Sequence, residues 1–186
     1  MALARRTRTA IAVGSTLVGL IVVLLVVGLP LYVFPASATI QRADLVQVLG
    51  PAQDDRIEMA EQLVADGYAG HILVSVPPEG EPASDPEWCS DPLFTCRVPD
   101  PYTTDGETVM LEQYAREHGV SSTIVLTETG HVSRARYIYA TCYPGEATVV
   151  EVPAERTLSW LLWTYAYQSG AFIKAFLTPC ADTPGP

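Results

Sequence analysis

Charged residues are scarce in this chain, and basic residues are the scarcer kind. The 186 residues include 11 Lys and Arg against 21 Asp and Glu; charged residues make up 17% and hydrophobic residues 48%. A disordered chain would carry more charge and fewer apolar residues, so the composition excludes that class. Cysteine is also sparse, and four cysteines are too few for a disulfide-built mini-protein of this length. The length fits one domain of ordinary size.

Three motifs that signal cofactor binding or catalysis are missing. No G-x-G-x-x-G occurs, so a dinucleotide site has no support, and a methyltransferase with a nucleoside cofactor would rest on fold analogy alone. No G-x-S-x-G occurs, so a hydrolase triad is not indicated. No C-x-x-C occurs and no histidine lies near a cysteine at ligand spacing, so a zinc site is a weak alternative. We therefore expect no cofactor and no metal.

One long apolar run explains why an acidic chain, with a pI near 4.6, has a positive mean hydropathy of +0.20. Residues 10–34 contain no charge and follow Arg5, Arg6 and Arg8. This length predicts a transmembrane anchor, with residues 1–9 as a cytoplasmic basic tail and 35–42 as a linker outside the membrane. The alternative is a signal peptide cleaved after the A-x-A site at 36–38, but the run is longer than the usual signal core.

The segment after residue 38 is more acidic than the whole chain. It holds eight basic and 21 acidic residues, a formal charge of −13. Nucleic-acid binding needs clustered Lys and Arg, so we expect no nucleic-acid partner. Broad adhesion to anionic lipid headgroups is disfavoured for the same reason, and the lipid bilayer is expected as a partner through the N-terminal helix alone.

All four cysteines lie after the apolar run, which predicts two disulfides in an extracytoplasmic domain. Cys89 and Cys96 form the natural local pair, and Cys142 with Cys180 would then tie a late helix to the C-terminal tail. Three pairings are possible, and the sequence does not choose between them.

Strand and helix patterns alternate from residue 43 to residue 180. Short apolar runs at 44–49, 71–76, 123–127 and 147–152 predict buried strands, and helical patterns occupy the segments between and after them, the last over about 155–177. This order predicts a Rossmann-like three-layer α/β domain with a mostly parallel sheet of about four strands. Residues 77–103 are predicted to be a long loop stapled by Cys89–Cys96, and 181–186 a tail.

The last helical pattern has a second interpretation. Residues 158–176 contain one charge, Lys174, and many aromatic residues, so the segment could be a second membrane span. Gln168, Ser169 and Gly170 interrupt it and weaken insertion. We prefer a helix that packs on the sheet or lies against the membrane surface.

His131 and Arg134 are three residues apart at the predicted start of a helix, so they share a face. A cation in a first helical turn is unfavourable unless an anion answers it, and that anion is either a carboxylate of the protein or a bound phosphate or carboxylate. Arg56 raises the same question, although Asp54, Asp55 and Glu58 are close enough in sequence to answer it. Thr104 and Glu107 fit a T-x-x-E capping box, which would explain both without a ligand.

Four segments resemble the YdcF/SanA/ElyC-like family, a bacterial domain of unknown function. They are ADLVQVLG at 43–50, residues 55–75, residues 103–120 and IVLTETGHVSRAR at 124–136. The most specific part is T-x-x-x-H-x-x-R-A, here Thr127, His131, Arg134 and Ala135. The cysteines indicate a shorter, actinobacterial-type branch. The sequence departs from the family at Gly50-Pro51-Ala52, after Ser75, and at Gly130, where members usually have an aromatic residue.

The resemblance implies a membrane-anchored Rossmann-like domain that acts in the cell envelope, with no settled reaction. Its pocket positions, transferred one by one, make His131 and Arg134 the candidate catalytic residues. The candidate ligand-binding residues are Gly50, Arg56, Ser75, Thr104, Glu107 and Thr127.

Two functions follow from these patterns. The first is an envelope enzyme or binder for an anionic small molecule, such as a phosphate-bearing or lipid-carrier-linked cell-wall precursor. Arg56 and Arg134 would hold the anion and His131 would act as acid or base. The second is a non-catalytic envelope interaction module with a degenerate pocket.

Overall fold

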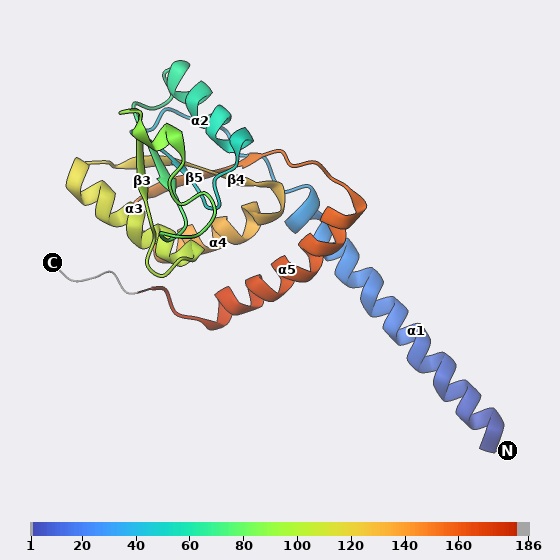
Figure 1. Ribbon diagram of the computed structural model, residues 1–186. Helices are drawn as coiled ribbons and strands as arrows, with labels where there is room; N and C mark the ends of the chain where they lie inside the picture. The colour runs from blue at the N-terminus through green and yellow to red at the C-terminus, as the bar shows by residue number, and fades with distance from the viewer. Residues whose placement is uncertain (1, 182–186) are drawn as a thin grey trace.

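The computed structural model describes residues 2–181, with side chains from residue 11 onward (Figure 1). Most of the predicted tail at 181–186, and the side chains of the basic residues 5–8, lie outside this part. The elements in chain order are α1 (Ala2–Gly28), the π-helical turn η1 (Leu29–Val33), β1 (Leu45–Val48), α2 (Asp54–Ala65), β2 (Ile72–Ser75), the 3-10 turn η2 (Glu87–Ser90), β3 (Phe94–Arg97), α3 (Thr104–His118), β4 (Ser122–Glu128), the 3-10 turn η3 (Thr129–His131), α4 (Val132–Cys142), β5 (Glu146–Val152) and α5 (Leu158–Leu177).

The sheet is parallel throughout, with five strands in the order β3-β2-β1-β4-β5. The α/β class, the parallel pairing and the helices on both faces confirm the sequence-based prediction. The predicted number of about four strands was wrong, because β3 lies inside the segment 77–103 that we expected to be loop. The order of the strands reverses between β1 and β4, and ligand sites of such sheets lie outside the carboxyl strand ends at that point.

β3 is short and lies at the edge of the sheet, which is why its sequence gives little signal. Phe94 is buried, whereas the other residues of the strand are half-buried. Its register with β2 pairs Ile72 with Phe94 and Val74 with Cys96. The disulfide Cys89–Cys96, with Cα atoms 5.8 Å apart, joins the strand to η2. Four residues of mixed polarity become a strand here because a neighbouring strand supplies the hydrogen bonds.

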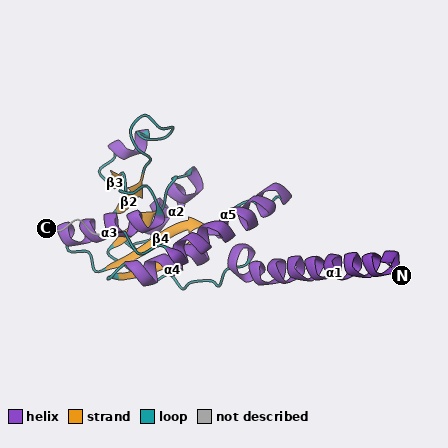
Figure 2. Ribbon diagram, turned by 90° about the horizontal axis from the view of Figure 1, so that it is seen from below, coloured by secondary structure: helices purple, strands orange, loops and turns teal. Residues whose placement is uncertain are grey.

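Two hydrophobic layers cover the sheet, one on each face. In β1, Val46 and Val48 face α2, and Leu45 and Leu49 face α3 and α4. Side chains alternate between faces along a strand, so a strand buried on both sides is apolar at nearly every position. Figure 2 shows α2 and α4 on opposite sides of the strands. The predicted three-layer arrangement is therefore confirmed.

The N-terminal helix extends away from the domain (Figure 1). It is the one helix among residues 2–181 that is long and apolar enough to cross a membrane, over Ile11–Val33. A signal sequence has the same features, so the two interpretations of the apolar run both agree with the structure.

The C-terminal helix α5 packs on α4, η3 and η1. Its buried residues are Thr164 and Gln168. The second predicted disulfide, Cys142–Cys180, joins the end of α4 to the segment that follows α5, with Cα atoms 5.5 Å apart. Both predicted pairs are therefore confirmed, and the second holds α5 across the carboxyl ends of the strands.

Candidate functional site

A cavity of about 620 Å³ lies where α3, α4 and α5 meet the carboxyl end of β1. Five of the predicted site residues line it, namely Gly50, Thr104, Glu107, His131 and Arg134. The other three, Arg56, Ser75 and Thr127, are buried behind this wall. The structure thus brings together residues from four separate segments of the chain.

His131 is held between two threonine hydroxyls. Its Nδ1 lies 2.8 Å from Thr127 Oγ1 and its Nε2 lies 3.2 Å from Thr104 Oγ1. Burial, followed by the nearby cations Arg134 and Arg56, lowers the pKa of His131 well below its usual value. The imidazole is therefore neutral at neutral pH, and in a neutral imidazole one nitrogen donates and the other accepts.

Arg134 has no carboxylate partner. Its Nε donates to Gln168 Oε1 at 2.9 Å and one terminal nitrogen donates to Thr104 Oγ1 at 3.3 Å. No ion pair among residues 11–181 includes it, so the first of the two expected anions, a carboxylate of the protein, does not pair with Arg134 in this part of the chain. A guanidinium carries five N–H donors. Most of those on Arg134 therefore have no acceptor in the described part of the chain.

Arg56 is 3% exposed and also lacks an ion-pair partner within the described segment. One terminal nitrogen donates to Leu49 O at 3.0 Å, while its Nε has no hydrogen-bond partner among residues 11–181. Asp55, expected to answer this cation, accepts a hydrogen bond from the Arg56 backbone N–H instead. Burial lowers the pKa of Arg56, and Glu128 is the first of the acidic groups that oppose the effect.

Glu107 does not belong to a capping box, and this part of the prediction was wrong. The residue that caps α3 is Thr103, whose Oγ1 accepts from Gly106 N at 3.3 Å. Because the cap lies one residue earlier than expected, Thr104 and Glu107 turn into the domain. Glu107 Oε1 accepts from Gly50 N at 2.7 Å. Burial raises the pKa of Glu107 to about 7, and the Gly50 N–H opposes part of that rise.

Gly50 is needed because its surroundings leave little space. A Cβ built there would lie 3.1 Å from the Ser75 carbonyl oxygen and 3.1 Å from the Tyr102 hydroxyl. The Ser75 hydroxyl is buried without a hydrogen-bond partner of good geometry among residues 11–181, although it is near enough to help lower the pKa of Glu107. The ends of β1 and β2 therefore approach each other closely at Gly50 and Ser75.

Gly130 is buried against α5. A Cβ built there would lie 2.6 Å from Thr164 Cγ2 and 3.5 Å from the Trp160 ring. A glycine is therefore favoured at this position, since α5 occupies the space that a side chain would need.

Several residues of the site were missed by sequence reasoning. Tyr102, Tyr167, Gln168 and Lys174 line the cavity, and the last three come from α5. Gln47, in the middle of β1, donates to the backbone carbonyl of Glu107 at 3.2 Å. Gln47 could have been found from the sequence, because it is a polar residue inside an otherwise apolar strand and a buried polar group needs a hydrogen-bond partner. Nothing in the sequence placed α5 over the strand ends.

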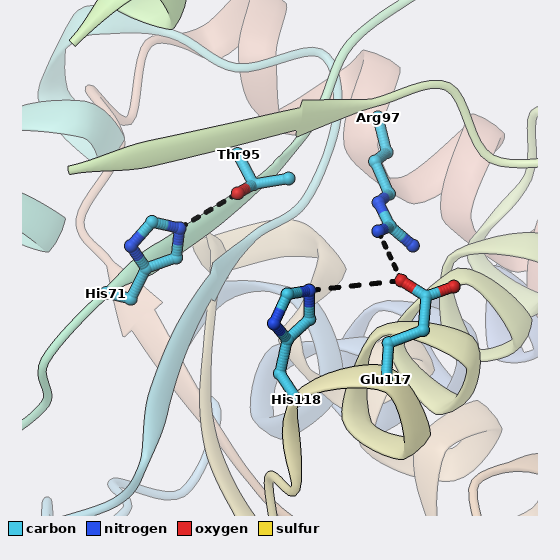
Figure 3. Close-up of polar contacts among 5 residues, drawn as sticks. All are labelled: His71, Thr95, Arg97, Glu117 and His118. Carbon is cyan, nitrogen blue, oxygen red and sulfur yellow. Dashed lines mark hydrogen bonds and ion pairs between the residues drawn. The ribbon is translucent and has the colours of Figure 1, made fainter. Parts of the chain in front are cut away.

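The chain's other two histidines lie outside the cavity lining. Figure 3 shows the polar contacts that they make instead. His71 Nε2, just before β2, lies 2.9 Å from Thr95 Oγ1 on the edge strand β3. His118 Nε2 is 3.9 Å from Glu117 Oε2, and Arg97 pairs with the same carboxylate at 2.5 Å. His131 is therefore the one histidine placed to act on a ligand in this cavity.

No known protein family, no characterised protein and no solved structure matches this chain. Residues 11–181 also contain no group of three His, Cys, Asp or Glu side chains arranged to hold a metal ion.

The wall of the cavity can serve an anion and a proton. Arg134 offers unused donors beside the Thr104 hydroxyl, and Lys174 is at the same cavity. The His131 imidazole accepts a proton only when a neighbouring negative charge stabilises it, because burial opposes its ionisation. Glu107, with a pKa of about 7, can exchange a proton near neutral pH.

Proposed function

We propose that this chain is a membrane-anchored, extracytoplasmic protein of the cell envelope. Its cavity would bind an anionic small molecule, such as a phosphate-bearing or lipid-carrier-linked cell-wall precursor. We also propose that the chain belongs to the YdcF/SanA/ElyC-like family, which it resembles, and that its N-terminus lies in the cytoplasm. The two disulfides support a domain outside the cytoplasm, because disulfides persist in oxidising compartments.

One observation carries the anionic ligand. Two arginines have no ion-pair partner in the described residues, although the outer segment carries a charge of −13: the half-buried Arg134 in the wall of the cavity and the buried Arg56 behind that wall. A buried charge is costly unless something pairs with it. A bound phosphate or carboxylate next to Arg134 and Thr104 would supply that pairing, and planar guanidinium groups bind such anions with parallel hydrogen bonds.

The ligand would touch Arg134 and the Thr104 hydroxyl, with His131 behind that hydroxyl. For the Thr104 hydroxyl to donate to the anion, His131 would carry its proton on Nε2 and donate to Thr104 Oγ1, while its Nδ1 accepts from the Thr127 hydroxyl. Arg56 would act from behind the wall by its charge. Glu107 would take up a proton when the anion binds, since a second negative charge disfavours its ionised form.

Thermal melting of the full chain in detergent, with inorganic phosphate, pyrophosphate or a sugar nucleotide added, tests the proposal. We expect the melting temperature of the wild type to rise with ligand concentration, and we expect Arg134→Gln and Arg134→Ala to lose most of that rise. Arg97→Ala, which removes a partly exposed arginine outside the cavity, is the matched control. No stabilisation of the wild type by any of these ligands, together with an unchanged profile for Arg134→Ala, would rule the proposal out.

A second candidate function, the non-catalytic envelope interaction module, is favoured by one observation. Both nitrogens of His131 already have threonine partners, so the imidazole fits a structural role as well as a catalytic one. The two functions separate in a cell that depends on this protein. If His131→Ala abolishes the cellular role while the purified variant still folds, the module interpretation fails. If the variant keeps that role, His131 is not catalytic.

A further inference from the structure

One face of α5 is apolar and uncovered. The side chains on this outward face are each more than half exposed, with exposed fractions of 62% to 81%. They belong to Leu162, Trp163, Ile173, Phe176 and Leu177. The opposite face of the helix is packed on the domain, where Thr164 and Gln168 are 4% and 3% exposed. An apolar patch of this kind on a folded domain marks an interaction surface.

The position of α5 relative to the apolar segment Ile11–Val33 identifies what covers that face. Tyr165 donates through its hydroxyl to Leu25 O at 2.7 Å, and its ring lies edge-on to Tyr32 at 5.4 Å. A Cβ at Gly28 would collide with the Tyr165 ring, so this ring packs directly against the α1 backbone at Gly28. α5 therefore lies at the level of the last turns of the apolar segment.

The direction of α5 agrees with this level. Figure 1 shows that α5 begins beside the domain end of α1 and runs crosswise to α1. A helix crosswise to a membrane-spanning helix lies in the plane of the bilayer surface. Its outward face then meets the outer leaflet, whereas its inner face closes the cavity.

The composition of α5 fits that location. The helix contains no acidic residue and a single basic one, Lys174, in an outer segment that otherwise carries many carboxylates. It has two tryptophans and two tyrosines, the residue types that concentrate at the boundary between lipid and water. Attachment through apolar side chains needs no basic cluster, which agrees with the acidity of the domain.

We propose that α5 is an interfacial membrane helix whose outward face is embedded in the outer leaflet of the bilayer. The inference rests on the membrane anchor of the proposed function, and not on the anionic ligand. Because Gln168 on the inner face of α5 holds Arg134 at 2.9 Å, the membrane-bound helix also positions a wall of the cavity.

Quenching of tryptophan fluorescence by brominated lipid tests this placement. The full chain is reconstituted in vesicles of zwitterionic phosphatidylcholine, with or without bromine on the acyl chains. In a chain with Trp88→Phe and Trp160→Phe, the remaining Trp163 should lose about half or more of its emission to bromine, as expected for a side chain at the lipid boundary. In the matched chain that keeps Trp88 alone, the emission should not change, because Trp88 packs on Phe94 in the loop segment.

A third chain separates this inference from the anchor on which it rests. Val22→Trp, in a background without the native tryptophans, places the indole inside the apolar segment. If that indole is quenched while Trp163 is not, α5 is not embedded and the inference is wrong. If neither is quenched, the membrane anchor fails and the inference fails with it. If Trp163 is not quenched and the outward face of α5 can be cross-linked into dimers, that face contacts a second copy of the chain. This result would also overturn the inference.

A substitution on the face itself gives the last test. Ile173→Glu should abolish most of the Trp163 quenching, since a carboxylate on the outward face opposes insertion. Val98→Glu, at an apolar residue that is 47% exposed in the segment before α3, should leave the quenching unchanged. Equal quenching in Ile173→Glu and Val98→Glu would contradict the embedding. Unchanged melting temperatures for both variants show that the fold is intact.

Discussion

The buried carboxyl of Glu107 predicts an unusual pH dependence of stability, and Glu107→Gln tests it. In most proteins the pKa of a carboxyl falls on folding, whereas here burial raises the pKa from 4.5 to about 7. Between these values the folded protein binds a proton that the unfolded chain releases. The free energy of unfolding therefore falls as the pH rises through this window.

The size of the effect follows from the pKa. A rise from 4.5 to about 7 corresponds to about 3 kcal/mol at 1.36 kcal/mol for each pKa unit. Glu107 is only 4% exposed, so solvent screening removes little of this energy. From about pH 5 to about pH 8 the wild type should lose about 2–3 kcal/mol through this one group. The neutral amide of glutamine keeps an oxygen for the Gly50 N–H and does not titrate.

The assay is urea unfolding of the full chain in detergent, with intact disulfides, followed by tryptophan fluorescence at a series of pH values. Stability relative to Glu107→Gln should fall by about 2–3 kcal/mol across the range. His131 acts in the opposite direction, because its pKa is lowered by burial, and stability from this group rises with pH up to about its ordinary value of 6.5. Since His131 is present in both proteins, its contribution cancels in the difference.

Glu61→Gln, at an exposed carboxylate on α2, is the control and should follow the wild type. A difference between the wild type and Glu107→Gln that stays constant from about pH 5 to about pH 8 would refute the reasoning. It would mean that the Glu107 carboxylate is hydrated or paired with a cation in the folded protein. The cavity wall around it would then be more accessible to water than in the structure.

Two further predictions concern the attachment of α5. Replacing Cys142 and Cys180 with serine should lower the free energy of unfolding by about 4 kcal/mol, against about 2 kcal/mol for the shorter disulfide, because the closed loops span 38 and 7 residues. Denaturant unfolding without reductant measures both, and equal losses would contradict the loop argument. Gly130→Ala should cost about 1–3 kcal/mol because its Cβ would lie 2.6 Å from Thr164 Cγ2. Thr164→Ser removes that methyl group and should recover most of the loss in the double variant, whereas simple addition of the two losses would show that the contact is not the cause.

The sequence predicted the layers of the fold well, because each layer depends on local pattern. Apolar runs and helical spacing identified four strands and the helices that cover them, and Gly119 ends α3 with a φ of 71° where glycine is favoured. β3 was not predicted because its residues acquire strand geometry only by pairing with β2. The two disulfides were predicted from parity and proximity in sequence, and the structure selects that pairing from the three that were open.

The sequence predicted part of the site, and the errors in that prediction have a single cause. Each erroneous assignment took a neighbour in sequence as a neighbour in space. Asp55 was expected to answer Arg56, and Glu107 was expected to reach back to its own helix start. In the folded chain Glu107 bonds to Gly50 N, 57 residues earlier, and Arg134 bonds to Gln168, 34 residues later. Such partners come from segments that are far apart in the chain and meet only in the folded structure. The spacing of residues within one segment therefore cannot predict them.

The residues that the resemblance did not include change how the site is understood. The motif on which the resemblance rests contains His131 and Arg134, but α5 completes the cavity that they line, and Gly130 makes room for that helix. The same helix contacts the end of the apolar segment through Tyr165. If the apolar segment spans a membrane, as we propose, an anion that enters the cavity arrives beside the membrane surface. This geometry suits a phosphate at the end of a lipid carrier better than a freely diffusing one, and the ligand titration and the quenching experiment test the two halves of that argument separately.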